Sequence, residues 1–181
     1  MNATHSERAL LASFGELLEF PRTHLGAQAR GLLDDLASLD SAAHAHMEAF
    51  IEAVERSTDA EIEEHYTRAF DLAPQAVPYL SVYLFGAEGT QRGPFMAGLR
   101  KSYDEYGFDA GHELPDHVAN VLRYALAAPE EEWTALREWC VPPPVKQMAR
   151  DLERVQNLYR HLLHALVSLL AMPSEGETEH V

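Results

Sequence analysis

Apolar side chains recur every three or four residues along most of this chain, which is the spacing that places them on one face of an α-helix. The first such stripe consists of Leu10, Leu11, Phe14, Leu17 and Leu18. Pro21 ends the helix that carries this stripe. The one run with strand-like composition, residues 77–85, has no obvious partner with which it could form a sheet. The pattern therefore predicts an all-α fold.

Helix boundaries follow from the same stripes together with prolines, glycines and capping residues. We expect further helices over about residues 25–36, 41–56, 58–70, 95–106 and 145–170, with two more that begin at Pro115 and Pro129. Thr58 and Glu61 have the spacing of a capping box. Gly107 suits the end of the fifth helix, and the prolines at 142–144 end the seventh. The count comes to about eight helices.

Residues 71–94 carry three prolines and three glycines, and we interpret them as a long central loop. Within this loop, residues 77–85 are expected to form an extended or short helical segment packed on the core. A chain of 181 residues is long enough for one hydrophobic core and too short to make two domains the expectation. We predict a single all-helical domain over residues 1–173 and a disordered acidic tail over 174–181.

Charge and composition exclude several classes of protein. Fourteen basic and twenty-nine acidic side chains give a net charge of −15, which repels nucleic acid and favours cationic partners. The single Cys140 excludes an intramolecular disulfide and fits a reducing compartment. The first residues show no signal peptide, and the longest apolar stretch, 165–172, is too short to cross a membrane. We expect a cytoplasmic monomer or weak dimer.

Ten histidines raise the alternative of a small helical metal-binding or enzymatic bundle. Such bundles place Glu-x-x-His on each of two helices, and here the spacing occurs only at Glu177 and His180, in the tail. His161 and His164 share a helix face but have no evident carboxylate motif opposite them. No glycine-rich phosphate loop with its lysine is present. We therefore expect no metal, no cofactor and no enzymatic activity.

The residues most suggestive of a binding site lie at 113–117, Glu-Leu-Pro-Asp-His. Glu113, Asp116 and His117 concentrate two carboxylates and an imidazole at an expected helix start, where they could bind a cationic group. Because helix N-termini favour anions, these carboxylates could instead serve the helix itself. If Pro115 occupies the first helical turn, Asp116 and His117 should be exposed, and their replacement should cost little stability.

Three short motifs resemble one known family when they are taken in order. Residues 66–71, Tyr-Thr-Arg-Ala-Phe-Asp, resemble its Tyr-x-x-Leu-Phe signature, with Ala69 in place of leucine. Residues 78–83, Pro-Tyr-Leu-Ser-Val-Tyr, resemble its Ser-Val-Tyr loop, and residues 113–117 resemble its Leu-Pro-Asp-His motif. Together they resemble the TorD/DmsD/NarJ redox-enzyme maturation chaperones. The Leu-Pro-Asp-His form is similar to the NarJ branch and the Ser-Val-Tyr loop to the TorD/DmsD branch, so the subfamily stays open.

This resemblance implies an all-helical, non-enzymatic chaperone for a molybdoenzyme. It implies binding of the N-terminal, twin-arginine-type peptide of the catalytic subunit while the molybdenum cofactor is inserted. Such a peptide carries paired arginines, which carboxylates recognise through parallel hydrogen bonds, and an apolar run that needs a groove. The expected peptide-binding residues are Tyr66, Phe70, Tyr83, Glu113, Asp116 and His117. The client, whether a nitrate, dimethyl sulfoxide or trimethylamine N-oxide reductase, is not specified by these residues.

Overall fold

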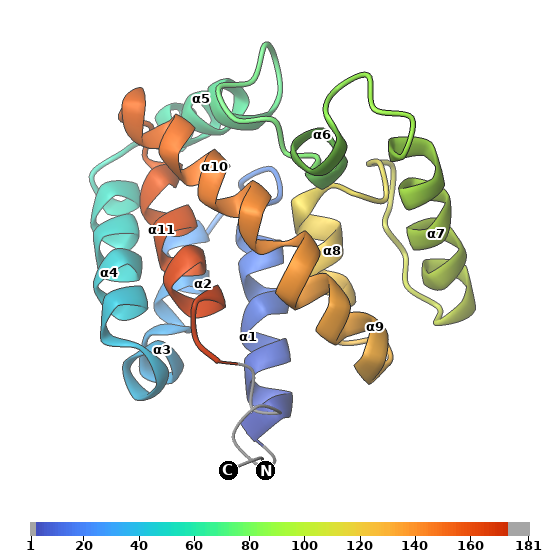
Figure 1. Ribbon diagram of the computed structural model, residues 1–181. Coiled ribbons are helices and arrows are strands. Elements are labelled where there is room, and N and C mark those ends of the chain that lie inside the picture. The colour runs from blue at the N-terminus through green and yellow to red at the C-terminus, as the bar shows by residue number, and fades with distance from the viewer. Residues whose placement is uncertain (1–2, 174–181) are drawn as a thin grey trace.

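The computed structural model describes residues 3–173, and the predicted acidic tail over 174–181 lies outside them (Figure 1). Helices account for the regular structure of this described part, in which the only β pairing is one isolated bridge between Tyr79 and His117. The all-α prediction is confirmed. The helices are α1 (Ala3–Leu17), α2 (Leu25–Arg30), α3 (Leu33–Leu39), α4 (Ser41–Glu55), α5 (Asp59–Phe70), α6 (Leu80–Phe85), α7 (Arg92–Glu105), α8 (Val118–Tyr124), α9 (Glu130–Ala135), the π-helical turn η1 (Leu136–Cys140), α10 (Pro142–Arg154) and α11 (Tyr159–Leu170).

Side-chain caps are present at the starts of α4 and α5, two helices that begin close to their predicted positions. The Thr58 hydroxyl accepts from the Glu61 amide, and the Glu61 carboxylate accepts in return from the Thr58 amide at 2.8 Å, so the predicted capping box is present at α5. The Asp40 carboxylate accepts from the Ala42 amide at 2.8 Å and caps α4. These contacts satisfy amide groups that have no partner within their own helix.

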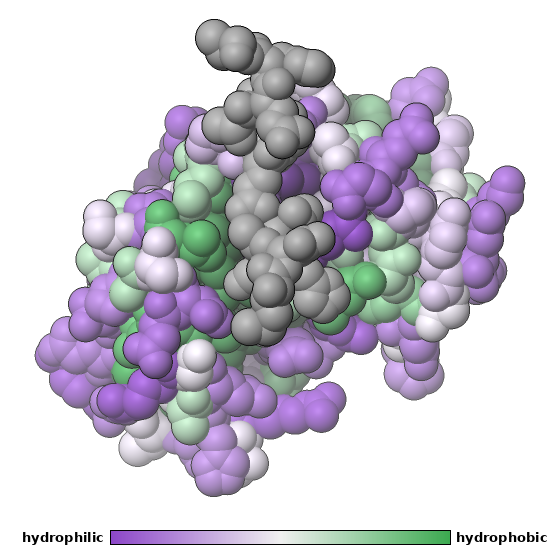
Figure 2. Space-filling model, turned by 90° about the horizontal axis from the view of Figure 1, so that it is seen from below, coloured by the Kyte–Doolittle hydropathy of each residue, from purple (hydrophilic) through white to green (hydrophobic). Residues whose placement is uncertain are grey.

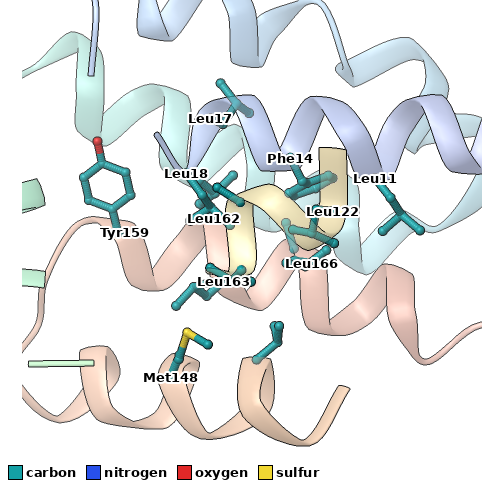
Figure 3. Packing of buried hydrophobic residues seen from close by; sticks show 14 of the residues in the cluster. Leu11, Phe14, Leu17, Leu18, Leu122, Met148, Tyr159, Leu162, Leu163 and Leu166 are labelled. Atoms are coloured by element: carbon teal, nitrogen blue, oxygen red, sulfur yellow. The ribbon is translucent and has the colours of Figure 1, made fainter. Parts of the chain in front are cut away.

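The core lies between α1 and the helices that surround it. The most extensive helix pairs are α4 with α11, α1 with α8, and α10 with α11, and Figure 1 shows α1 near the middle of the arrangement. Figure 3 shows how apolar side chains of α1, α8, α10 and α11 meet there. Leu11, Phe14, Leu122, Met148 and Leu166 are fully buried. Each such side chain contributes roughly 1.5–3 kcal/mol relative to an exposed one.

Two predicted helices are each broken into two. The predicted 25–36 helix is interrupted at Gly31 and Leu32, between α2 and α3. The predicted 145–170 helix is interrupted between α10 and α11, where Gln156 has a left-handed φ of 53°. The buried Asn157 amide stabilises this second break, because it donates to the His65 carbonyl at 2.8 Å and to the Gln75 side chain at 3.1 Å. These partners come from distant parts of the chain.

Three proline positions also differ from the prediction. Pro115 lies outside α8, which begins at Val118, and Pro129 is the residue before α9. The prolines at 142–144 do follow the preceding helix, but they form the first turn of α10. Proline is suited to that position because its missing amide would have no helical partner there.

The expected long central loop, residues 71–94, contains more helix than predicted. Its apolar part forms the short helix α6, with Leu80 and Ser81 buried, which confirms the short helical alternative. α7 begins within the loop at Arg92, and Gly107, with φ 67°, follows the end of that helix.

None of the described helices has the length and apolar character needed to cross a membrane. Figure 2 shows one face of the molecule, where hydrophilic residues occupy most of the edge and hydrophobic residues lie nearer the middle.

Candidate functional site

A cleft of about 930 Å³ opens where the end of α1, the end of α5 and the loop before α8 come together. Its lining comes from residues 16–28, 66–71, 78–79, 109–113 and 117–123. These segments are far apart in the sequence, and the isolated bridge joins two of them. The Leu80 amide donates to the Asp116 carbonyl at 3.0 Å, and the Val118 amide donates to the Pro78 carbonyl at 2.8 Å. The bridge therefore positions the loop before α8 beside the start of α6.

Carboxylates outnumber cations on the cleft wall. Its acidic residues are Glu16, Glu19, Asp71, Asp109 and Glu113. Two arginines, Arg22 and Arg123, line the same cleft, and Arg123 forms an ion pair with Glu19. A concave wall with an excess of one sign of charge concentrates ligands of the opposite sign. The cleft is therefore suited to a cationic ligand.

An aromatic wall adjoins these carboxylates. Tyr66 and Phe70 lie on the same face of α5 with ring centroids 5.3 Å apart, and both are largely buried. Phe20 lies edge-to-face on Tyr66 at 5.4 Å and is 51% exposed. The Tyr66 hydroxyl donates to the Leu18 carbonyl at 3.3 Å, and burial raises the pKa of Tyr66 above its usual range. Tyr66 therefore stays neutral and presents its ring, and Phe20 offers apolar surface to a ligand.

Glu113 is exposed on the loop before α8 and accepts a hydrogen bond from the Tyr79 hydroxyl at 3.2 Å. Burial and the Glu113 charge together raise the pKa of Tyr79, which keeps that hydroxyl a donor. Both residues line the cleft. Glu113 is thus an accessible carboxylate whose orientation is supported by one neutral neighbour.

Asp116 is fully buried, so the expectation that it is exposed is wrong. Its Oδ2 accepts from the Ser81 amide at 3.1 Å and from the Ser81 hydroxyl, and it does not line the cleft. The reason is that Pro115 precedes α8 instead of entering it, so the chain turns Asp116 inward against α6. The Arg92 Nε donates to the same Ser81 hydroxyl at 3.0 Å. Asp116 therefore connects the loop to α6.

His117 is also buried, against the expectation, although part of it lines the cleft. It is the N-cap of α8, where its Nδ1 accepts from the Ala119 amide at 3.2 Å, and its ring lies edge-to-face on Tyr79 at 5.6 Å. Burial lowers the pKa of His117, so the ring is neutral near pH 7 and acts as an acceptor. The helix is therefore capped by His117, and not by Asp116 or Glu113, the carboxylates for which that role was considered.

Tyr83 is half-buried on α6 and lies outside the cleft lining. Burial and the Asp151 charge raise its pKa to about 12. Of the six expected residues, the structure brings Tyr66, Phe70, Glu113 and His117 together on the cleft and leaves out Asp116 and Tyr83.

Sequence reasoning missed the part of the cleft that the end of α1 supplies. Glu16, Glu19 and Phe20 belong to it, and Arg123 of α8 faces them. The sequence shows only two acidic residues, Glu16 and Glu19, shortly before Pro21, a pattern that is also typical of a solvated helix end.

The alternative of a metal-binding or enzymatic bundle requires histidines and carboxylates that lie close together. The described residues contain no group of three or more histidine, cysteine or acidic side chains placed to hold a metal ion. His46 of α4 stacks on His164 of α11 with ring centroids 5.3 Å apart, and His164 Nε2 lies 3.3 Å from Glu153. Burial raises the pKa of Cys140, which disfavours the reactive thiolate.

Comparison with known proteins adds two findings. Residues 34–164 match the model of a family described as "Nitrate reductase delta subunit". A curated protein of Bacillus subtilis (strain 168), "Probable nitrate reductase molybdenum cofactor assembly chaperone NarJ", is 32% identical over 108 residues, which cover 59% of this chain and 58% of that relative. The alignment thus spans less than two thirds of the relative. The α5 wall and the loop before α8 fall within the family match, and Glu16 and Glu19 precede it.

Proposed function

Because the chain belongs to the nitrate reductase delta subunit family, we propose that it is a cytoplasmic chaperone for the assembly of a molybdoenzyme. The family and the NarJ relative point to a non-enzymatic assembly factor. That relative also favours a nitrate reductase as the client over the other reductases that the motifs left open. In this proposal the protein binds the catalytic subunit before its molybdenum cofactor is inserted.

The ligand of the cleft in this proposal is the N-terminal peptide of that subunit, of the twin-arginine type or a related basic and apolar sequence. The observation that carries the proposal is the cleft itself, in which accessible carboxylates face an aromatic wall. Arginine binds carboxylates through two parallel hydrogen bonds and also stacks on aromatic faces. An apolar run next to the arginines would cover Phe20 and the exposed edge of the aromatic wall.

Exposed apolar residues next in sequence to the cleft carboxylates support the same ligand class. Three of these carboxylates are each followed in sequence by an exposed large apolar residue, in the pairs Glu19–Phe20, Asp71–Leu72 and Glu113–Leu114. Exposed apolar side chains that gather at one site are typical of interaction surfaces. Phe20 lines the cleft, and Leu72 and Leu114 are exposed next in sequence to lining carboxylates, which suits a peptide that carries both charge and apolar side chains.

Neither kind of contact is sufficient alone. An exposed ion pair contributes about 0–1 kcal/mol, so the carboxylates mainly select the ligand and speed its association. Apolar burial contributes roughly 25 cal/mol per Å², and the cost of immobilising the peptide must be subtracted. We infer that Glu113, Phe70 and Tyr66 contact the peptide, that His117 shapes the cleft from behind, and that Asp116 and Tyr83 act through the position of α6.

A peptide titration tests this function. A fluorescently labelled peptide with paired arginines and an adjoining leucine-rich run should bind the purified protein. The same peptide with both arginines replaced by glutamine should bind several-fold more weakly. Glu113→Gln should weaken binding of the arginine peptide by about three- to fivefold, which is the range expected for one exposed ion pair.

The matched control is Glu63→Gln, which removes an equal charge from the outer face of α5, where Glu63 is exposed and away from the cleft lining. If both variants weaken binding equally, the peptide responds only to net charge and the cleft assignment is wrong. If the arginine and glutamine peptides bind equally, the proposed ligand class is wrong.

A further inference from the structure

One cation already lies among the carboxylates of the cleft, and it belongs to the chain itself. The Arg123 guanidinium donates to the Glu19 carboxylate and, at 3.2 Å, to the Asp109 carbonyl. Its central carbon lies 5.4 Å from the centroid of the Phe108 ring. The side chains of Arg123 and Glu19 are 27% and 34% exposed, so the pair is accessible from the cleft.

These three partners are the groups that bind a guanidinium in general. A carboxylate supplies charge and acceptors, a carbonyl supplies a further acceptor, and an aromatic face attracts the planar cation. The Asp109 carboxylate accepts from the Gly111 amide at 2.8 Å, a local contact that is separate from the carbonyl to which Arg123 donates. The cleft thus contains a complete arginine subsite, and Arg123 fills it.

Arg22 provides the contrast. It lines the same cleft and is exposed, and within the described residues it has neither an ion pair nor a side-chain hydrogen bond. Arg22 therefore adds positive charge to the cleft without occupying a carboxylate. Arg123 adds the same charge and also occupies Glu19.

We propose that Arg123 is an internal competitor of the client, and that an arginine of the client peptide displaces it from Glu19. This inference rests on the function proposed above. Arg123 restricts binding to peptides that can replace its contact with Glu19, which favours arginine over lysine because a guanidinium can give a carboxylate two parallel hydrogen bonds. The competitor thereby lowers the affinity of the cleft for basic sequences in general.

Displacement is feasible because Arg123 has partners that do not depend on Glu19. When Glu19 turns to the peptide, the guanidinium retains the Asp109 carbonyl and the Phe108 ring. Exposed ion pairs contribute little to stability, so the exchange of one for another has a small net cost. Glu19 lies just beyond α1, in the turn before Pro21.

The experiment measures binding of the paired-arginine peptide to Arg123→Gln, to Arg22→Gln and to the unchanged protein. Both variants remove one positive charge from the cleft, so a field effect alone raises their affinities alike. If Arg123 competes for Glu19, Arg123→Gln should bind about fivefold more tightly, and Arg22→Gln should change affinity by less than about twofold. Equal gains, or a loss with Arg123→Gln while thermal unfolding is unchanged, overturn the inference.

A double-mutant cycle locates the effect at Glu19. In a Glu19→Gln background, Arg123→Gln should give no gain, because the contested carboxylate is absent. A gain of the same size in that background overturns the inference. Should Arg123→Gln fail to fold, Arg123→Lys retains the charge and removes the guanidinium that donates to both Glu19 and the Asp109 carbonyl. That variant should still bind the peptide more tightly than the unchanged protein does, and its failure to do so counts equally against competition.

The outcomes separate this inference from the proposed function. If the unchanged protein does not discriminate between the arginine and glutamine peptides, the proposed function fails and Arg123 has no client with which to compete. If it discriminates but Arg123→Gln shows no gain, the function stands and the competitor role is wrong.

Discussion

Two regions of the molecule bring polar and titratable side chains together, and they do so differently. In the loop before α8, Asp116 and His117 are buried with partners from the backbone and from Ser81. Between α4 and α11, His46 and His164 stack on one another, and His164 Nε2 lies 3.3 Å from the half-exposed Glu153. Asp116 and His117 accept hydrogen bonds from backbone amides and from Ser81, whereas His46 and His164 place two like rings face to face.

The difference shows what makes a polar cluster useful. Backbone partners hold the loop in one position, so the exposed Glu113 beside them acquires a defined direction into the cleft. The histidine pair does not position a ligand group of the cleft, and burial, with a smaller contribution from the His164 charge, lowers the pKa of His46. We expect changes in the first region to affect both stability and binding, and changes in the second to alter stability with pH.

The largest expected effect is that of Asp116→Ala. The substitution leaves the Ser81 amide and hydroxyl without their acceptor in a buried place, which should cost roughly 2–3 kcal/mol of unfolding free energy. Asp116 Oδ1 has no partner among the described residues, so the loss of this atom offsets part of the cost. Chemical denaturation of the variant measures the change.

Asp71→Ala is the control for that measurement. Asp71 is an exposed carboxylate that lines the cleft, and its removal should change stability by less than about 0.5 kcal/mol. A similar small cost for Asp116→Ala would mean that the loop does not depend on Asp116, and the contrast between the two regions would lose its basis.

Much of the fold could be predicted from the sequence because its signals are local. The stripe on α1, the Thr58–Glu61 capping box and the glycine after α7 each act within a few residues. The break between α10 and α11 could not be predicted in this way. Asn157 stabilises it through His65 and Gln75, and no local pattern reports partners that are distant in sequence.

The sequence predicted which residues form the site better than it predicted how these residues are arranged. The motif at 113–117 and the aromatic pair of α5 do meet at the cleft. The expected exposure of Asp116 depended on Pro115 being helical, but α8 begins three residues later, at Val118, and Asp116 is buried. The contribution of α1 was missed because the acidic pair before Pro21 resembles any solvated helix end.

An effect of intermediate size is expected on stability as the pH falls. Burial, with a smaller contribution from the His164 charge, lowers the pKa of His46 below 6.5, and burial also lowers the pKa of His161 on α11. The unfolded chain then binds more protons than the folded one as the pH falls below about 6.5, so stability rises with pH in that range. Thermal unfolding between about pH 7 and pH 5 should show a falling melting temperature.

His46→Gln should make that fall shallower, because one of the groups with a lowered pKa is gone. His44→Gln is the matched control on the same helix, where His44 Nδ1 lies 3.4 Å from the Glu48 carboxylate. Its removal should leave the slope no shallower than in the unchanged protein. If the slope is the same in His46→Gln as in the unchanged protein, the histidine pair does not determine acid stability.

The smallest expected effect is that of Tyr79→Phe, which tests whether the hydrogen bond between Tyr79 and Glu113 helps to hold the loop before α8 in place. The substitution removes the hydroxyl that donates to Glu113 at 3.2 Å and keeps the ring that contacts His117 at 5.6 Å. Because Glu113 is exposed, water replaces the lost donor, and stability should change by less than about 0.5 kcal/mol. Affinity for the paired-arginine peptide should fall by no more than about twofold, since Glu113 keeps its charge and loses only part of its orientation. Tyr79→Ala, which also removes the ring from His117, should cost clearly more in thermal unfolding. Equal losses of stability in the two variants would mean that the Tyr79 hydroxyl also holds the loop before α8 in place. Glu113 would then be the first residue of this loop that serves only to bind the peptide.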